Sequence, residues 1–191
     1  MNKIILPLLA SFMVFPSFAQ EESTHFTFKG VPIDGTYDSF VSKLKQKGFK
    51  QDINDPYFML GDFAGYSDCR IVITHDTNKD IVYGVGVIFE EADSWSVLYT
   101  NYSNLKRMLT IKYGSPDSEV EEFQHPSSAT DDRSKMHEVR MGRSDFKTIF
   151  ENEKGHIILQ ISELDYKCNV TLIYVDNQNL NKVQTKAIDD L

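Results

Sequence analysis

Two amphipathic helical segments, each stopped by a glycine and each followed by strand-like runs, constrain the fold of this 191-residue chain most strongly. The first segment covers residues 37–47, with Thr36 in position to cap its start and Gly48 placed after its last turn. A threonine hydroxyl can accept a hydrogen bond from a free amide at a helix start, and glycine tolerates the left-handed backbone that ends many helices. The sequence therefore predicts a helix of about three turns here.

The second helical segment begins at Ser94 or Asp93 and ends at Gly114, and Pro116 prevents it from continuing. Apolar side chains recur along it at steps of three or four residues, which places them on one face of a helix. We expect this stripe to face a core, and its members are Trp95, Leu98, Tyr102, Leu105, Leu109 and Tyr113.

Strand-like runs follow each helical segment in blocks. Blocks of strands after a helix favour an α+β fold with an antiparallel sheet and helices packed on one face, rather than alternating βαβ units. We predict one globular domain, residues 20–191, built from two repeated helix-then-strands units, residues 20–92 and 93–191. The segment 124–135 is predicted to be a mobile loop. The predicted strands are 57–60, 69–74, 81–89, 119–123, 137–141, 146–151, 156–161 and 168–175, with a short helix after residue 179.

Two stretches carry a resemblance to a known family. Asp34–Phe49 and Leu105–Pro116 resemble the openings of β-lactamase-inhibitor-protein-like domains, which are tandem helix-plus-sheet domains and include small outer-membrane assembly lipoproteins. The whole chain also resembles uncharacterised exported α+β proteins of this size. The resemblance implies binding of a protein on the sheet face. The chain lacks the lipobox cysteine of the assembly lipoproteins.

The first nineteen residues have the layout of a secretory signal peptide. Lys3 gives a positive start, residues 4–15 are almost wholly apolar, and small residues precede a cut after Ala19. The apolar run is shorter than the ~20 residues that a membrane span needs. We predict cleavage near Ala19 and a periplasmic or secreted protein with no membrane span and no lipid anchor.

The charge balance limits the partners. The chain has 28 acidic against 20 basic residues and a formal net charge of −8. A nucleic-acid binder needs a basic surface to neutralise phosphates, so nucleic acid is an unexpected partner. We expect a protein or small-ligand partner in the cell envelope.

In an exported chain the two cysteines are candidates for a disulfide, because oxidising compartments allow disulfides to form. Cys69 and Cys168 both lie in strand-like segments. Two interpretations stay open at this point: a disulfide that links the two halves, or two separate buried thiols. Neither cysteine has the charged surroundings of a catalytic thiol.

Cofactor and metal motifs are incomplete in this sequence. Residues 83–89 contain Gly-x-Gly without the third glycine of a dinucleotide loop. Residues 76–87 contain the first three ligand positions of a calcium loop but neither its glycine nor its final glutamate. We therefore predict no cofactor, no metal and no catalytic residue.

The function predicted from the sequence is non-catalytic binding or interaction with an unknown ligand. We expect partner contacts at Phe63, at Tyr66 and at Tyr99, which lies off the apolar stripe of its helix. The alternative is an exported hydrolase that uses dispersed carboxylates and His75. A third hypothesis is a small-ligand carrier, which would have an apolar cavity between its helices and its sheet.

Overall fold

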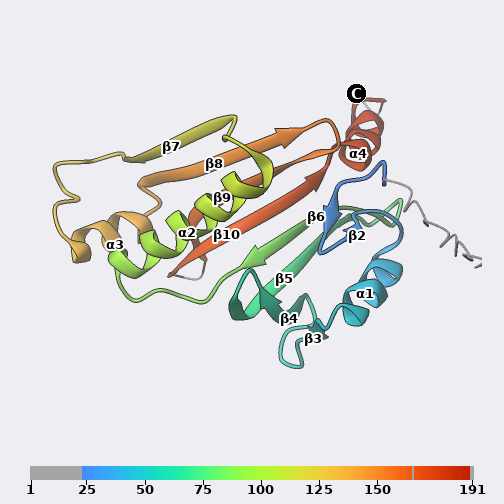
Figure 1. Cartoon of the computed structure of the whole chain (residues 1–191), viewed down its shortest axis with the longest axis horizontal. Coiled ribbons are helices and arrows are strands. Elements are labelled where there is room, and N and C mark those ends of the chain that lie inside the picture. Colours follow the sequence, from blue (N-terminus) through green and yellow to red (C-terminus); the bar gives the residue numbers. More distant parts are fainter. Residues whose placement is uncertain (1–22, 165, 190–191) are drawn as a thin grey trace, which may run out of the picture.

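The fold is built on one eight-stranded antiparallel sheet (Figure 1). The structure is a computed structural model that describes residues 23–164 and 166–189, so the predicted signal peptide lies outside the described residues. In spatial order the strands are β3 (Lys50–Gln51), β4 (Phe58–Phe63), β5 (Tyr66–Asp76), β6 (Ile81–Ile88), β10 (Lys167–Asp176), β9 (Gly155–Leu164), β8 (Ser144–Asn152) and β7 (Ser118–Phe123).

Helices cover one face of this sheet. Figure 1 shows α2 (Trp95–Tyr113) in front of β9 and β10, α3 (Asp132–Arg140) next to one end of α2, and α1 (Tyr37–Gln46) near β2 and β3. It shows α4 (Asn177–Asp189) at one end of the sheet, directly after β10. This arrangement confirms the predicted α+β class with an antiparallel sheet. Within the described part of the chain, no helix is both long and apolar enough to cross a membrane.

The predicted helix ends are confirmed for α1 and α2. The Thr36 hydroxyl accepts a hydrogen bond from the backbone amide of Ser39, and the Ser94 hydroxyl accepts one from the amide of Val97. Gly114 ends α2 with a φ of +93°, a backbone conformation that a residue with a side chain adopts only with strain. Local capping chemistry therefore sets the bounds of both helices.

The third helix corrects two predictions. Residues 137–141 were expected to form a strand and residues 124–135 a loop, but α3 begins at Asp132 and ends at Arg140. The Asp131 carboxylate accepts from the amide of Ser134 while the Ser134 hydroxyl accepts from the amide of Asp131, so the two residues form a capping box. This reciprocal cap favours a helix over the strand that the apolar side chains alone suggested.

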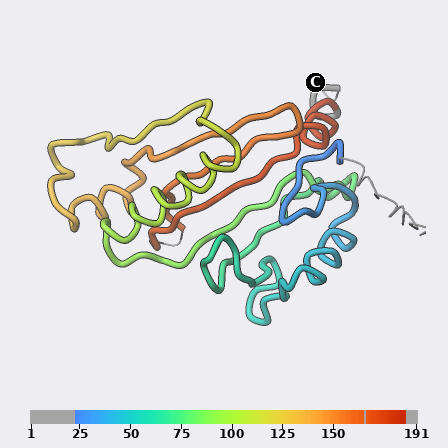
Figure 2. The backbone as a smooth tube through the Cα atoms, viewed as in Figure 1, coloured from blue at the N-terminus to red at the C-terminus, as the bar shows by residue number. Residues whose placement is uncertain are grey.

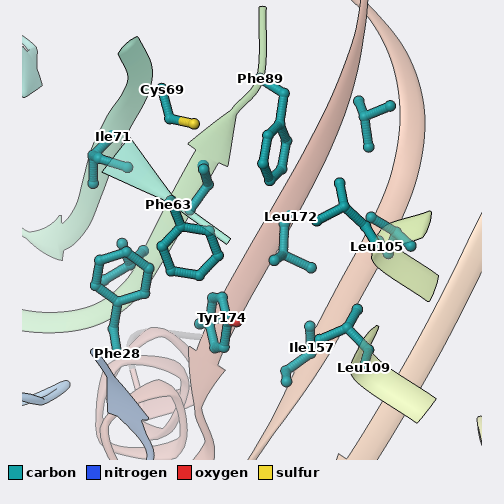
Figure 3. Close-up of a cluster of buried hydrophobic side chains, with 14 of the residues drawn as sticks. Phe28, Phe63, Cys69, Ile71, Phe89, Leu105, Leu109, Ile157, Leu172 and Tyr174 are labelled. Atoms are coloured by element: carbon teal, nitrogen blue, oxygen red, sulfur yellow. The ribbon is translucent and has the colours of Figure 1, made fainter. Parts of the chain in front are cut away.

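Alternation along the strands separates two faces of the sheet. In β9, Ile157 and Leu159 are fully buried under the helices, whereas Ile158 between them is only half-buried. In β10, Leu172 is buried and Ile173 is half-buried in the same way. Successive side chains on a strand point to opposite faces, so the core lies between the sheet and the helices (Figure 3).

A short N-terminal hairpin, β1 (Thr27–Phe28) and β2 (Val31–Pro32), completes the core on the helix side (Figure 2). The Phe28 ring stacks on the Phe63 ring with centroids 5.2 Å apart and meets the Tyr174 ring edge-on at 5.4 Å. The hairpin therefore packs over the middle of the sheet, next to β4 and β10.

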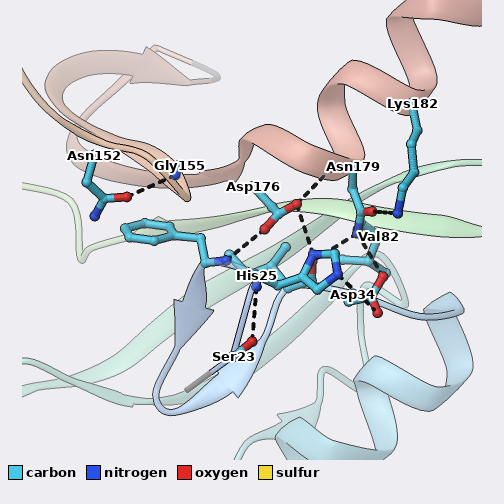
Figure 4. A network of polar contacts seen from close by, with 11 residues as sticks. Ser23, His25, Asp34, Val82, Asn152, Gly155, Asp176, Asn179 and Lys182 are labelled. Carbon is cyan, nitrogen blue, oxygen red and sulfur yellow. Dashed lines mark hydrogen bonds and ion pairs between the residues drawn. The ribbon is translucent and has the colours of Figure 1, made fainter. Parts of the chain in front are cut away.

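A buried carboxylate joins the two ends of the described chain (Figure 4). Asp176, at the end of β10, accepts hydrogen bonds from the backbone amides of Phe26 at 2.7 Å and Asn179 at 2.8 Å. Its Oδ1 also lies 3.2 Å from Nδ1 of His25. The N-terminal hairpin is thus tied to the junction of β10 and α4.

Cys69 and Cys168 are two buried free thiols, which is the second of the two interpretations that the sequence left open. Cys69 lies in β5 and Cys168 in β10, and β6 separates these strands. Neighbouring strands lie about 4.8 Å apart, so strands that flank a third lie about 10 Å apart. A disulfide needs its two Cα atoms within about 7 Å.

The two halves of the sheet meet at β6 and β10. Strands β3–β6 follow α1, and strands β7–β10 follow α2, which fits the predicted order of elements. The halves also differ, because α3 stands between β7 and β8 with no counterpart in the first half of the described chain. The repeated unit and the division into lobes stay predictions.

Candidate functional site

A cavity of about 210 Å³ lies between α2, the β4–β5 turn and the middle of the sheet. We call it the α2 cavity. Its residues come from β1, the β4–β5 turn, α2 and β10, four segments that are far apart in the sequence. The lining residues are Thr27, Lys29, Phe63, Ala64, Leu105, Met108, Leu109, Lys112, Leu172 and Tyr174.

One face of α2 forms a wall of the α2 cavity. Leu105, Met108, Leu109 and Lys112 are spaced by three, four and seven residues, which aligns them along one side of a helix. Leu105 and Leu109 are buried, whereas Met108 is 39% exposed and Lys112 is exposed. The wall therefore changes from apolar at the sheet to charged at the surface.

The opposite wall is the tight turn between β4 and β5. Phe63 pairs with Tyr66 across the two-residue turn formed by Ala64 and Gly65, both of which have positive φ. Two consecutive residues with positive φ are typical of a type I′ turn, whose twist matches that of the two flanking strands. The turn places Phe63 and Ala64 against the cavity, and Leu172 and Tyr174 of β10 line it from the sheet. Figure 3 shows the Phe63 ring beside Leu172 and Tyr174.

The Tyr174 hydroxyl is the unusual group in this site. The residue is only 4% exposed, and no residue of the described chain forms a hydrogen bond with the hydroxyl. Fully buried side-chain oxygens and nitrogens in the described part all have partners. The Tyr174 hydroxyl must therefore touch accessible space, and the residue lines the α2 cavity.

The Tyr174 hydroxyl is also a permanent donor. Burial raises its pKa well above the ordinary value of 10.0, and the neighbouring Tyr113 adds to the rise. A phenol with a raised pKa stays protonated at neutral pH, so it can donate a hydrogen bond to an acceptor in the cavity.

Two exposed lysines stand on the rim of the α2 cavity. The Lys29 Nζ lies 5.8 Å from the centre of the Phe63 ring, and the Lys112 Nζ lies 4.8 Å from the centre of the Tyr113 ring. Neither amine has a carboxylate within 4.0 Å among the described residues. The Lys29 backbone lies in the turn between β1 and β2, where its φ is +51° and that of Gly30 is +75°.

The predicted partner contacts do not form one site. Phe63 lines the α2 cavity, but Tyr66 lines a separate, more polar cavity of about 730 Å³ on the other side of the turn. Burial raises the pKa of Tyr66, and a hydrogen bond with the Asn104 side chain opposes that rise. Tyr66 therefore belongs to a different cavity from Phe63.

Tyr99 lies at the far end of α2 from the α2 cavity. Its hydroxyl donates to Oε2 of Glu121 at 2.8 Å, and its ring stacks on Trp95 with centroids 5.5 Å apart. The hydrogen bond to the Glu121 carboxylate is the main cause of the raised pKa of Tyr99. The Tyr99 hydroxyl therefore already has a hydrogen-bond partner within the protein.

His75 packs against the Tyr37 ring with centroids 4.7 Å apart. Oδ1 of its neighbour Asp76 accepts hydrogen bonds from the backbone amides of Asn78 and Lys79, both at 2.8 Å, and so closes the β5–β6 turn. No group of three or more metal-ligating side chains is found in residues 23–164 and 166–189. The hydrolase hypothesis gains no geometric support from His75 and Asp76.

Sequence reasoning found one residue of the α2 cavity, Phe63, and missed its polar groups. Tyr174 follows the strand alternation, so the pattern indicates burial but does not reveal an unpaired hydroxyl. Lys29 lies in a turn-rich segment, and Lys112 follows the apolar stripe of α2 at the i+3 position from Leu109. No local signal brings these three residues together, because they meet only in the folded chain.

Comparison with known proteins finds no family model, no curated protein and no solved structure that matches the chain. The resemblance to β-lactamase-inhibitor-protein-like domains therefore stays a prediction.

Proposed function

We propose that this chain is a non-catalytic binding protein that holds a small, mostly apolar molecule in the α2 cavity. The Tyr174 hydroxyl is the observation that carries the proposal, because it lies in an apolar lining without a partner. The hydroxyl touches accessible space, so in the free protein only solvent can accept its hydrogen bond. A bound molecule with an acceptor atom takes the place of that solvent.

The size of the α2 cavity supports a small ligand. A cavity of about 150 Å³ is enough to hold benzene, whereas drug-sized ligands need about 300 Å³ or more. A volume of about 210 Å³ suits a ligand of roughly ten non-hydrogen atoms. With such a ligand we expect a free energy of about −6 kcal/mol, or a Kd on the order of tens of micromolar.

We also propose that the protein acts in the periplasm or outside the cell. The pattern of residues 1–19 supports export, although these residues lie outside the described structure. N-terminal sequencing of the protein recovered from its native cells should begin at Gln20. A protein that still begins at Met1 would contradict export.

Calorimetric titration with octan-1-ol tests the binding proposal, because this alcohol has about ten heavy atoms and an acceptor oxygen. We expect saturable binding to the native protein and a rise in Tm of a few degrees at ligand concentrations well above Kd. In Met108→Trp the larger side chain should occupy the rim of the cavity and weaken binding at least tenfold.

Ile111→Trp is the matched control, since Ile111 is on the same helix, is 76% exposed and does not line the α2 cavity. This variant should bind octan-1-ol as the native protein does. Absence of binding to the native protein, or equal loss in both variants, would refute a ligand site in the α2 cavity.

A further inference from the structure

We infer that the ligand of the α2 cavity is an amphiphile with a single carboxylate, whose apolar chain lies in the cavity and whose carboxylate accepts hydrogen bonds from Lys29, Lys112 and the Tyr174 hydroxyl. This inference rests on the proposed function and names the class of ligand. Three observations carry it: the two rim amines, the absence of acids from the lining, and the donor character of every ionisable group there.

The two rim amines are unpaired in a chain that has acids to spare. Acidic residues outnumber basic ones by 28 to 20. Lys106 has a carboxylate partner in Glu119 at 3.0 Å, whereas Lys43 and Lys45, exposed on α1, have none within 4.0 Å among the described residues and serve as the comparison below. Lys29 and Lys112 instead rest over aromatic rings, which leaves their charge available to an anion.

The α2 cavity differs from the other large cavities in charge. None of its lining residues is acidic. The polar cavity beside Tyr66 is lined by four acids, and a third cavity, near β3, is lined by three. The surface beside Trp95 is lined by two. Basic residues also line these cavities: two stand against the four acids beside Tyr66, three against the three acids near β3, and one against the two acids beside Trp95. Only the α2 cavity, with two lysines and no acid, has an excess of positive charge among these four cavities, and this excess favours an anion there. The acids beside Tyr66 are Asp68, Glu90, Glu91 and Asp93. Those near β3 are Asp52, Asp62 and Asp68, and those beside Trp95 are Glu121 and Glu122.

The ionisable groups of the α2 cavity only donate hydrogen bonds. A lysine ammonium has three donors and no acceptor, and the Tyr174 phenol stays protonated. A ligand whose polar atoms are donors, such as an amine, finds no matching ionisable group. A carboxylate offers two acceptor oxygens with about four lone-pair sites, enough to bind both amines.

The residue types of the site favour a carboxylate over a phosphate. Bidentate recognition of phosphate is typical of arginine, and no arginine lines the α2 cavity. Most of the lining is aliphatic or aromatic, so most of the ligand has to be apolar. A chain of about eight carbons with one terminal carboxylate fits both the volume and the charge.

The experiment compares octanoate, octan-1-ol and octylamine on the native full-length protein by calorimetry at low ionic strength. We expect octanoate to bind about tenfold tighter than the alcohol, and the amine to bind more weakly than the alcohol. The preference for octanoate should fall as salt is added, because exposed charges are screened.

The double variant Lys29→Met/Lys112→Met keeps the apolar stems and removes both charges. It should bind octan-1-ol unchanged and lose the preference for octanoate. The control Lys43→Met/Lys45→Met changes the net charge equally at exposed positions of α1 and should keep the preference.

The outcomes separate the two proposals. Equal binding of octanoate and octan-1-ol to the native protein would overturn the carboxylate inference and leave the binding function standing. Loss of the preference in both double variants would overturn it as well, since the effect would then follow net charge. If none of the three compounds binds, the proposed function itself fails.

Discussion

Tyr174 belongs to the core face of β10, where its inward-facing neighbours Leu172 and Asp176 are respectively apolar and fully hydrogen-bonded. Its hydroxyl adds nothing to the stability of the fold, because no protein atom accepts its hydrogen bond. Groups that are costly to folding and have no structural role are typical of binding sites.

The variant Tyr174→Phe separates stability from binding. Removing an unpaired hydroxyl should leave the free energy of unfolding unchanged or raise it by about 1 kcal/mol. The same change should weaken octan-1-ol and octanoate binding several-fold. Urea unfolding and calorimetry measure the two effects, and a clear loss of stability in Tyr174→Phe would contradict our account of this residue.

A second prediction at the residue scale concerns the two buried thiols, Cys69 and Cys168. Burial raises the pKa of the Cys69 thiol to about 11 and also raises that of Cys168, so few reactive thiolates exist at neutral pH. The mass of the intact protein should not change on reduction. A thiol reagent should label both cysteines only after denaturation; a gain of two hydrogens on reduction would show a disulfide instead.

At the scale of elements, the buried carboxylate of Asp176 fastens the N-terminal hairpin to α4. Asp176→Ala leaves the amides of Phe26 and Asn179 without their acceptor. We expect a loss of about 3 kcal/mol in the free energy of unfolding. Glu153→Gln, which changes an exposed carboxylate, is the control. Equal stability of both variants would show that the hairpin is not held by Asp176.

The same junction should make stability depend on pH through Asp34. Burial raises the pKa of Asp34, but hydrogen bonds from the Asn179 side chain and the Gly35 backbone and the charges of His25 and Lys182 lower it below the ordinary 3.8. A lowered pKa in the fold means that the ionised form stabilises the native state. This contribution is complete above pH 3.8 and is lost as the pH falls through the folded pKa.

Denaturant unfolding of Asp34→Asn against the native protein measures this contribution. The native protein should be the more stable one at about pH 6, and the difference should shrink as the pH falls below 3.8. A difference that stays constant over that range would show that the ionised carboxylate is not responsible.

Sequence reasoning predicted α1 and α2 well because their signals are local. A capping hydroxyl, a stripe of apolar residues and a terminal glycine all lie within one helix. It failed at α3, where the capping box of Asp131 and Ser134 outweighs a short apolar pattern that also suits a strand. It left a disulfide and two free thiols open at Cys69 and Cys168, because a pairing depends on the strand order.

At the scale of the whole molecule, the α2 cavity forms because the fold brings four distant segments of the chain together. Its floor is β10, one wall is the β4–β5 turn, the other is α2, and Lys29 enters from the N-terminal hairpin. Strand β10 reaches the centre of the sheet only because it pairs with β6. The sequence reveals each part, but their meeting depends on contacts between distant segments, which no local pattern encodes.

The most direct test of our account is a methyl NMR titration of the native protein with octanoate. We predict that the methyl signals of Met108, Leu109 and Leu172 shift together and saturate with one ligand per chain, while those of Ile88 and Ile158 on the helix-free face stay constant. If the lining methyls do not shift, or if only the helix-free face responds, the α2 cavity is not a ligand site.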